Sequence, residues 1–409
     1  MSAPWLGELP NGWQEIALRY LARIETGSRD TVDAVPGGEY PFIIRSQTPL
    51  EIDTYSYDTE AVLTAGDGAV GEIFHHINGR FEVHQRVYVM HDFHGLDGRY
   101  FYYYFSSEFG QTVAYGGAQS TVASLRRPMF TGFPVAVPPL EVQRAIANYL
   151  DRETAQIDAF IAKNEELITL LSERRATVID RSVFGFRDES DSVERRVPDF
   201  VEEFAALRDF VRRTPIDWGV ARFKAVTRRR VIRNVDGSAT MRSLKTTGEV
   251  VGRTSQQSPD DSSIPRYLLV EPDDLVVNPM WLVGGAIGVS TRHGAVSPDY
   301  RVFRPRPELV PRFLHHLLRS RPYRAQYELF TRAETTFDRR VNQPDLDRLP
   351  IPIPPPDEQI SIAAAIDREL DRIDDTIEVA KRGIGLARER RAALISAAVT
   401  GKIDVGVAA

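Results

Sequence analysis

The sequence contains no cysteine, only five lysines and no long apolar run. The absence of cysteine excludes disulfides and every metal site that depends on thiolates. A transmembrane helix needs roughly 18 consecutive apolar residues, which this chain lacks. The first residues also lack the basic and apolar stretches of a signal peptide. We therefore expect a cytoplasmic protein without a membrane segment.

Charge is distributed unevenly along a chain whose composition is otherwise that of an ordinary globular protein. Of the 409 residues, 42% are hydrophobic and 26% are charged, and the formal net charge is −6. This suits a chain of a few domains with buried cores. Residues 1–134 hold 9 basic and 16 acidic residues, whereas residues 215–349 hold 22 and 15. The second region therefore has the positive charge that phosphate binding requires, and the first lacks it.

One long segment occurs twice, 216 positions apart and without a gap. Residues 134–139 match residues 350–355, and the match continues to Asp188 and Asp404. Residues identical in the two copies include Gln143/Gln359, Ile146/Ile362, Ala147/Ala363, Asp151/Asp367, Ile157/Ile373, Asp158/Asp374, Arg175/Arg391 and Gly185/Gly401. Because an internal repeat defines the architecture, we expect the order globular domain, long helix, globular domain, long helix.

The repeated segments have the pattern of long helices. Residues 140–184 and 357–404 contain no proline, and their apolar residues recur at alternating spacings of three and four, as in a coiled coil. The two seams are Ala147, Leu150, Thr154, Ile157, Ile161, Asn164, Ile168, Leu171 and Val178, and Ala363, Ile366, Leu370, Ile373, Ile377, Ala380, Ile384, Ala387 and Leu394. Asn164 either fixes the register or marks a solvated part of the seam. Gly383 and Gly385 each cost about 1 kcal/mol in a helix, which indicates close helix approach or a kink.

The two globular regions have the pattern of mixed sheets and share weak similarity. Strands are expected at residues 40–44, 61–63, 87–89, 268–270, 275–277 and 301–303, and short helices at 98–107 and 311–320. Trp13 corresponds to Trp218, residues 69–71 to 286–288, and residues 86–88 to 301–303. The two regions are therefore expected to share one fold while their loops have diverged.

We predict an α+β fold in which two globular mixed α/β domains are separated by two long helices, with a pseudo-twofold internal repeat. The helices are expected to form an antiparallel coiled coil; the alternative is two separate helices, each packed on its own domain. The predicted boundaries are 1–136 for the first domain, 137–184 for the first helix, 185–214 for a linker, 215–352 for the second domain, and 353–409 for the second helix and a C-terminal tail.

The repeated signature resembles the specificity subunits of Type I restriction–modification systems. It reads Val-Pro-Pro-Leu-Glu-Val-Gln at residues 137–143 and Pro-Pro-Pro-Asp-Glu-Gln at residues 354–359. The ends of the second copy, Arg-Arg-Ala-Ala-Leu-Ile at 390–395 and Thr-Gly-Lys-Ile-Asp at 400–404, resemble the family as well.

The resemblance implies a non-catalytic protein with two target-recognition domains, each reading one half of a bipartite sequence in double-stranded DNA. It implies that the helix pair sets the unread spacer and docks two modification methyltransferase subunits. A motor-nuclease restriction subunit would complete the complex. The chain itself then needs no cofactor, and the complex is expected to use S-adenosylmethionine, ATP and Mg. The acidic first domain departs from this expectation.

Two motifs suggest an enzyme instead, and both are incomplete. Residues 66–71 spell G-x-G-x-x-G, but the following residues read as a strand and a turn where a dinucleotide site needs a helix. Residues 278–281, Asn-Pro-Met-Trp, resemble the Asn-Pro-Pro-aromatic motif of adenine methyltransferases, with a different third residue and no glycine-rich methyl-donor loop. The pairs His75-His76 and His315-His316 lack a third metal ligand and are interpreted as DNA-facing or surface residues. The alternatives are a self-contained DNA methyltransferase and a coiled-coil scaffold without a DNA role.

Candidate DNA contacts follow from side-chain chemistry, because Arg reads guanine and Asn or Gln reads adenine through paired hydrogen bonds. The alternative for each cluster is a solvated basic face. In the second domain the candidates are Arg228, Arg229, Arg230, Arg233, Lys245, Arg339, Arg340, Asn342 and Gln343. In the first domain they are Arg45, Gln47, His75, His76, Asn78, Arg80, Gln119 and Ser120.

Overall fold

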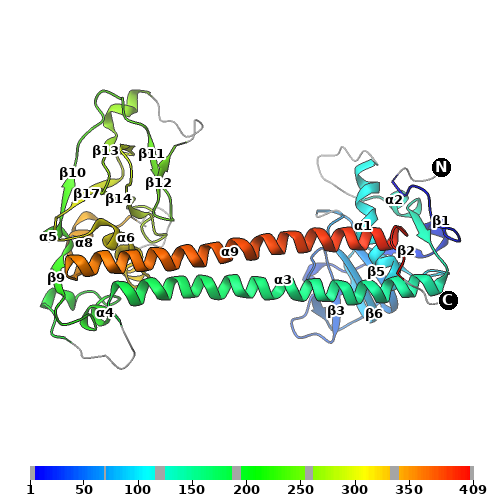
Figure 1. The fold of residues 1–409 in the computed structure, drawn as a ribbon. Coiled ribbons are helices and arrows are strands. Elements are labelled where there is room, and N and C mark those ends of the chain that lie inside the picture. Colours follow the sequence, from blue (N-terminus) through cyan, green and yellow to red (C-terminus); the bar gives the residue numbers. More distant parts are fainter. Residues whose placement is uncertain are drawn as a thin grey trace. The chain divides into compact units, whose positions relative to one another are not determined.

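The computed structural model describes residues 5–68, 71–115, 125–186, 195–253, 261–331 and 340–405. The chain divides into two compact units, the first comprising Met1–Glu165 with Lys381–Ala409 and the second Glu166–Ala380. Helices α3, Leu140–Val183, and α9, Pro356–Val399, each contain 44 residues and run through both units (Figure 1). Each unit therefore combines one globular domain, the start of the helix that follows it and the end of the other helix.

Each domain begins and ends on a two-stranded antiparallel ribbon. In the first unit β1, Gln14–Ala17, pairs with β8, Pro134–Val137. In the second unit β9, Gly219–Arg222, pairs with β18, Pro350–Ile353. The repeated proline-rich segments thus form the exit strands, and the long helix follows directly. Prolines 138 and 139 delay the start of α3 to Leu140, because proline disfavours helix in the residue before it.

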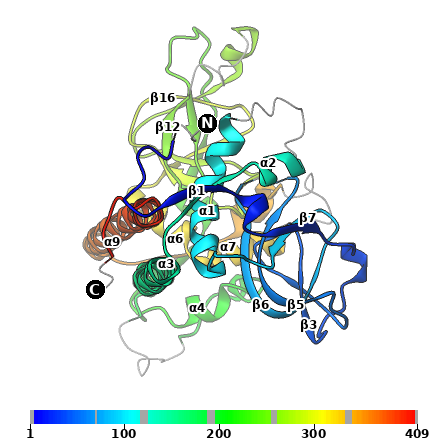
Figure 2. The same cartoon turned by 90° about the vertical axis from the view of Figure 1, so that its right-hand side faces the viewer.

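The first domain is built on a six-stranded sheet with the order β2–β7–β5–β6–β3–β4. The strands are β2 Arg23–Thr26, β3 Tyr40–Ile43, β4 Leu50–Ile52, β5 Tyr57–Ala65, β6 Phe74–Val83 and β7 Val87–His91. All neighbours are antiparallel except β3 and β6. Helices α1, Gly98–Tyr115, and α2, Arg127–Thr131, precede β8. Figure 2 shows β3, β5, β6 and β7 as a curved sheet beside α1.

The second domain repeats the central part of this sheet, with the order β10–β17–β14–β15. Its elements are β10 Thr227–Arg230, β11 Arg242–Leu244, β12 Val250–Gly252, β13 Leu268–Val270, β14 Leu275–Val277, β15 Ile287–Val289, β16 Gly294–Val296, β17 Arg301–Pro305, α4 Arg208–Arg212, α5 Phe223–Val226, α6 Pro311–Arg319, α7 Arg321–Phe330 and α8 Gln343–Arg348. Two further ribbons, β11–β12 and β13–β16, replace the outer strands of the first domain. The order β2–β7–β5–β6 corresponds to β10–β17–β14–β15, so the domains share one fold, as predicted.

The long helices close the core of each domain. In the first unit Ile146 and Leu150 of α3 and Ile395 and Val399 of α9 pack with aromatic side chains of α1 such as Phe105. In the second unit Val183 of α3 and Ala363 and Ile366 of α9 join a core with α6 and α7. Within each unit the start of one helix therefore packs with the end of the other, which is antiparallel packing. The predicted α+β fold is confirmed.

The predicted seam lies between the helices. Ala147, Leu150, Thr154 and Ile157 are buried in the first unit, and the seam residues of α9 from Ala363 to Ile377 are buried in the second. Asn164 is half-buried and donates to the Phe160 carbonyl of its own helix. A Cβ at Gly383 would lie 3.5 Å from the Phe160 ring, whereas one at Gly385 would meet nothing within 4 Å. Close helix approach therefore explains Gly383 only.

Residues 195–214, assigned to a linker by sequence, are part of the second unit. Val201, Phe204, Leu207 and Val211 are buried in its core. Helix α4 lies in this segment. In the described part of the chain no helix is long and apolar enough to cross a membrane.

A buried glutamine fastens the first helix to its domain. Gln143 is fully buried on the first turn of α3. Its Oε1 accepts from the backbone N–H of Asp97 at 2.7 Å, and its Nε2 donates to the carbonyls of Gly95 at 3.0 Å and Pro138 at 2.8 Å. The amide thus uses both of its donors and its acceptor on backbone groups.

The second repeat makes the same contacts. Gln359 is also fully buried, and its partners are Val310 N at 2.7 Å, Glu308 O at 2.9 Å and Pro354 O at 2.8 Å. The glutamine identity in the two copies therefore has a direct structural cause.

Replacing either glutamine with leucine is expected to destabilise its unit. Gln143→Leu or Gln359→Leu leaves three backbone groups without a partner, and each such group costs about 1–3 kcal/mol when buried. Urea unfolding of the full chain should reveal a loss of about 3 kcal/mol or more for each variant. Gln156→Leu, at an exposed position of α3, is the control and should change stability by less than about 0.5 kcal/mol. Equal stabilities for all three variants would contradict this role.

Candidate functional site

Corresponding loops of the two domains are held in the same way. The Leu125 N–H donates to the Gly66 carbonyl at 2.7 Å, and the Val341 N–H donates to the Pro279 carbonyl at 3.1 Å. Leu125 and Val341 are 216 positions apart. Each lies two residues before a short helix, Leu125 before α2 and Val341 before α8. Gly66 follows β5 and Pro279 follows β14, the corresponding strands.

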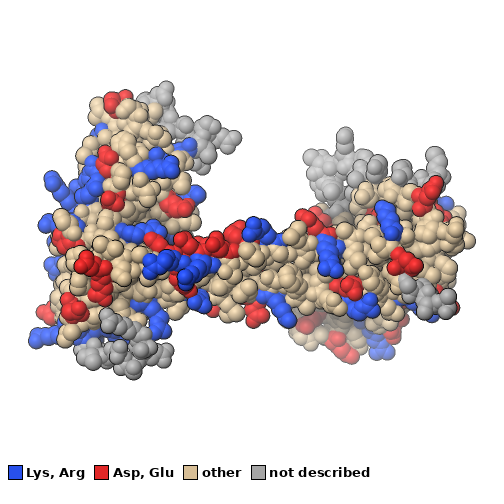
Figure 3. Space-filling model, viewed as in Figure 1, with Lys and Arg blue, Asp and Glu red and all other residues tan. Residues whose placement is uncertain are grey.

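These loops define two candidate interfaces. The first candidate interface comprises residues 66–68 with Arg45 and Arg86. The second comprises residues 278–281 and 340–343 with Arg229 and Arg301. Figure 3 shows lysine and arginine side chains, in blue, interspersed with acidic side chains, in red, over the visible face of each unit.

Three arginines form a cluster at the second candidate interface. Arg229 and Arg340 are exposed, and Arg301 is half-buried. Burial lowers the pKa of the Arg301 guanidinium, and the positive charges of Arg229 and Arg340 lower it further. In the described part of the chain the buried Nη1 of Arg301 has no hydrogen-bond partner. An anionic group bound here would satisfy that donor and offset the repulsion.

The predicted polar readers flank this cluster. Asn342 is exposed, and its side chain makes no capping hydrogen bond to α8. Gln343 donates from Nε2 to Asp347 Oδ1 at 2.6 Å, while its buried Oε1 has no partner among the described residues. Arg339 lies outside the described residues. Asn342 is thus open to solvent, and Gln343 is partly committed to its own helix.

The remaining candidates of the second domain lie elsewhere. Arg230 pairs with the buried carboxylate of Asp274, which Arg304 also contacts at 2.8 Å. Arg230 is thus half-buried and engaged in an internal ion pair. Arg228 and Arg233 are exposed. Lys245 lies 3.5 Å from Glu249 on the β11–β12 hairpin, beside a cleft that Arg242, Arg312 and Arg319 also line.

A shared carboxylate organises the first candidate interface. Arg45 and Arg86 donate to the two oxygens of Asp67 at 2.7 and 2.8 Å. Burial alone would raise the pKa of Asp67, but the two guanidinium hydrogen bonds outweigh it and lower the pKa. Both arginines remain substantially exposed. This edge therefore carries two cations and one anion.

Other described candidates of the first domain are engaged in contacts within it or are exposed. Gln47 donates to the Phe74 carbonyl at 3.3 Å, and the His75 ring bonds the Ser46 carbonyl at 2.9 Å. Burial lowers the pKa of His75, so the imidazole is neutral near pH 7. Arg80 pairs with Asp58 at 3.1 Å, and Asn78 is exposed. Gln119 and Ser120 lie outside the described residues.

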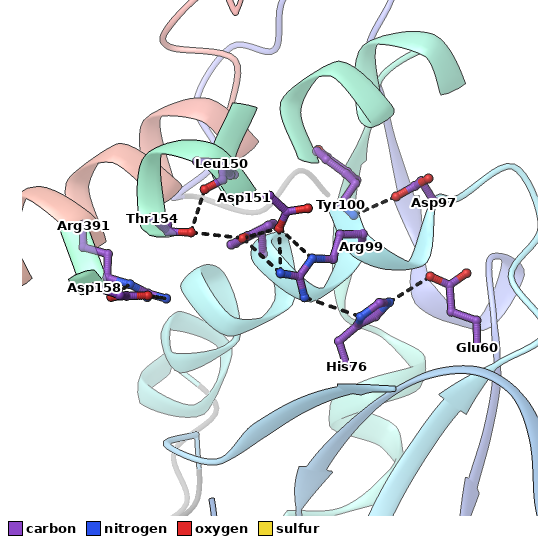
Figure 4. Close-up of polar contacts among 11 residues, drawn as sticks. Glu60, His76, Asp97, Arg99, Tyr100, Leu150, Asp151, Thr154, Asp158 and Arg391 are labelled. Carbon is purple, nitrogen blue, oxygen red and sulfur yellow. Dashed lines mark hydrogen bonds and ion pairs between the residues drawn. The ribbon is translucent and has the colours of Figure 1, made fainter. Parts of the chain in front are cut away.

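His76 belongs to a polar network between the sheet and α3 (Figure 4). Its Nε2 lies 2.8 Å from Glu60, and its Nδ1 lies 3.5 Å from Arg99. Arg99 and the Tyr103 hydroxyl both donate to Asp151 on α3, at 2.8 and 2.7 Å. His76 therefore lies within this network, between Glu60 and Arg99.

The second unit has a corresponding network around Asp367, the repeat equivalent of Asp151. Arg312 donates to both oxygens of Asp367, and His316 Nε2 lies 2.8 Å from Oδ1. Burial, with the nearby Arg312, lowers the pKa of His316 to about 4. His315 and His316 are 8% and 3% exposed. The interpretation of this pair as DNA-facing or surface residues is therefore wrong, because α6 turns both side chains toward the protein interior.

The described parts of the two enzyme-like motifs form turns. Gly68 and Gly71 adopt positive φ angles of 77° and 76°, and Gly71 lies in the turn before strand β6, as the sequence predicts; residues 69 and 70 lie outside the described residues. Asn278 uses its Oδ1 to accept from the Met280 N–H at 3.1 Å and so holds its own turn. Among the described residues no group of three or more His, Asp or Glu could hold a metal.

Sequence reasoning missed Arg86, Arg301 and Trp281 as members of these interfaces. Arg86 and Arg301 do occupy matching positions in the weak similarity between the domains, so the signal was present. Trp281 was noted only as part of a methyltransferase-like motif. It is 57% exposed on the loop after β14.

The burial of His315 predicts a loss of stability at mildly acidic pH. Burial, then the neighbouring His316, holds the pKa of His315 well below 6.5, and the Nδ1 accepts from the Val289 N–H at 3.3 Å. Below pH 6.5 the unfolded chain binds a proton that the folded chain excludes, so the free energy of unfolding falls as pH falls. The loss approaches about 1.4 kcal/mol per pH unit for one such group.

Urea unfolding at pH 7.5 and 5.5 measures this effect. His315→Gln keeps an acceptor without a titrating group and should lessen the pH dependence. His94→Gln, at an exposed position, should leave it unchanged. An identical pH dependence in wild type and His315→Gln would rule the explanation out.

Comparisons with known proteins find similarity to one family. The family model for the Type I restriction modification DNA specificity domain matches residues 10–169. The chain is 28% identical over 225 residues to the Type I restriction enzyme EcoDI specificity subunit of Escherichia coli. That match covers 54% of this chain and 50% of the subunit, so the chain spans half the length of this curated relative.

Solved structures share the fold along nearly the whole chain. One, from work on complex assembly and conformational transition of the type I R-M system, has a TM-score of 0.63 at 14% identity and covers 97% of this chain and 100% of its own. The HsdS subunit from Thermoanaerobacter tengcongensis has a TM-score of 0.51 at 15% identity, covering 98% and 99%. At these identities the likeness is one of fold.

Proposed function

We propose, on the premise that the chain belongs to the specificity subunits of Type I restriction–modification systems, that it is a non-catalytic subunit recognising a bipartite sequence in double-stranded DNA. Each domain reads one half-site, and the helix pair sets the spacer. Two modification methyltransferase subunits dock on the helices, and a motor-nuclease restriction subunit completes a cytoplasmic complex. S-Adenosylmethionine, ATP and Mg serve those partners.

The observation that carries this proposal is the equivalence of the two candidate interfaces. Each lies on the loop after corresponding strands, held by the same backbone hydrogen bond. Each domain is fastened to its helix by the same glutamine and the same aspartate. A chain that presents the same region of one fold twice, with different side chains, suits a target with two different half-sites.

The second candidate interface has suitable chemistry for DNA. The guanidiniums of Arg229, Arg301 and Arg340 can bind phosphate through charge-assisted hydrogen bonds. Exposed Asn342, beside them, has the paired donor and acceptor that recognise adenine. Phosphate contacts position a protein on DNA, and base contacts specify the sequence. We assign the arginine cluster mainly to the first role and Asn342 to the second.

Matching exposed leucines support two equivalent docking surfaces for the methyltransferase subunits. Leu170 on α3 and Leu386 on α9 are 216 positions apart, and they are 55% and 68% exposed. Phe160 and Val379 are further exposed apolar residues on the helices. Apolar side chains left exposed in both repeats suit a surface that a partner covers.

Genome-wide mapping of adenine methylation tests the proposed function. Deleting the gene should abolish methylation of one bipartite motif, and the lost motif gives both half-sites and the spacer. The double variant Arg229→Ala/Arg340→Ala should lose the same motif, because binding falls uniformly when phosphate contacts are removed. Arg348→Ala, an exposed arginine paired with Glu203 and Asp345, is the control and should keep it. A motif set that survives the deletion would refute DNA recognition by this chain.

The docking surfaces predict the subunit ratio of the complex. Leu170→Glu and Leu386→Glu should each remove one of the two methyltransferase subunits, because a buried unpaired carboxylate opposes association. Native mass spectrometry of the purified complex measures this ratio. Leu329→Glu, at a position on α7 that is 61% exposed, should retain two subunits. Two subunits bound to both helix variants would exclude these surfaces.

A further inference from the structure

The second candidate interface presents a tryptophan to solvent. Of the four tryptophans, Trp218 is buried, Trp5 and Trp13 are half-buried, and Trp281 is 57% exposed. Burying an aromatic side chain of this size stabilises a fold by roughly 2–3 kcal/mol. The domain forgoes much of that stabilisation at Trp281, although the next residue, Leu282, is fully buried.

The backbone holds the indole outward. The Trp281 N–H donates to the Asn278 carbonyl at 3.2 Å, and the Trp281 carbonyl accepts from the Ala286 N–H at 3.1 Å. Asn278 Oδ1 accepts from Met280 N, and buried Leu282 ties the next position to the core. Arg324 also donates to the Val283 carbonyl at 3.1 Å. The loop is therefore ordered before any ligand binds, which reduces the entropy lost on binding.

Trp281 lies beside the arginine cluster, because its chain neighbours contact the segment that carries Arg340. Its neighbour Met280 accepts from Arg340 Nε at 3.4 Å through the Sδ atom, and Pro279 accepts from the Val341 N–H. A phosphate bound by the cluster would bring the adjacent nucleotides to this loop. Apolar side chains beside phosphate-binding groups are the arrangement by which proteins wedge open a base step.

We propose that Trp281 inserts against the bases of the half-site read by the second domain, stacking on one base and partly unstacking its step. This inference rests on the proposed function and assigns a specificity-determining residue to it. The preferred step is then a pyrimidine–purine step, because such steps unstack most easily. Among the described residues of the corresponding loop in the first domain no aromatic side chain is present, and Asp67 there pairs with Arg45 and Arg86.

Binding of duplex DNA by the assembled complex tests the proposal. Trp281→Ala should weaken binding to the methylated motif by roughly 10- to 100-fold, the range for loss of one stacked base. Trp281→Phe should retain most of the affinity. The slope of log affinity against log salt should stay the same, because no phosphate contact is lost. 2-Aminopurine placed along the second half-site should change fluorescence at one step with wild type and not with Trp281→Ala.

Matched variants separate this inference from the proposed function. Leu329→Ala removes another exposed apolar side chain of the same unit and should bind as wild type does. If wild type binds the bipartite motif and Trp281→Ala binds it with an affinity within twofold of wild type, the proposed insertion of Trp281 is wrong and the recognition function stands. A Trp281→Ala variant that loses as much affinity for unrelated DNA as for the motif would also overturn the proposed insertion. Wild-type complex without a preferred motif would instead refute the recognition function.

Discussion

The fold depends on a buried side-chain amide that joins each long helix to the domain before it. Gln143 and Gln359 satisfy three backbone groups apiece, at the point where a proline-rich strand turns into a helix. Prolines supply no N–H, so the carbonyls at this turn have few partners; the amide donates to one of them, Pro138 or Pro354, and to one carbonyl of the domain, Gly95 or Glu308. A carboxylate would repel those carbonyls, and an alkyl group would leave them unpaired. This strict requirement explains why the glutamine is identical in both repeats.

The anchors are the same in the two units, while the surfaces that they support differ. Asp151 and Asp367 both receive an arginine from the domain, Arg99 from α1 and Arg312 from α6. The second donor has changed, from the Tyr103 hydroxyl to the His316 ring. Such pairs fix the direction in which a domain leaves its helix. Loops distant from these contacts can then vary without disturbing the frame, which is the property that a pair of recognition domains needs.

The sequence predicted features that depend on local pattern or on the repeat. Helices α3 and α9, the shared fold of the domains and strands such as 61–63 and 275–277 follow from periodicity and turn residues. The parallel pairing of β3 with β6 does not, because residues far apart in the chain determine it. The partners of individual side chains could not be predicted from the sequence either. The sequence does not reveal that Arg230 pairs with Asp274, or that Nη1 of Arg301 has no partner among the described residues. Residues 195–214 were assigned to a linker because they lie between the two repeats, although Val201, Phe204, Leu207 and Val211 are buried in the core of the second unit.

The opposite charges of the two domains have a counterpart in their side-chain contacts. In the first domain the candidate cations have close carboxylate partners: Arg45 and Arg86 share Asp67, and Arg80 pairs with Asp58. In the second, Arg340 has Asp299 only at 3.8 Å, and Arg229 and Arg340 repel Arg301. Long-range attraction to phosphate scales with uncompensated charge. Under the proposed function the second domain therefore supplies most of the electrostatic attraction. The first domain must exchange its internal ion pairs for DNA contacts. Such an exchange contributes more to discrimination between sequences than to affinity, because only a well-fitting site offsets the free energy lost with the broken pairs.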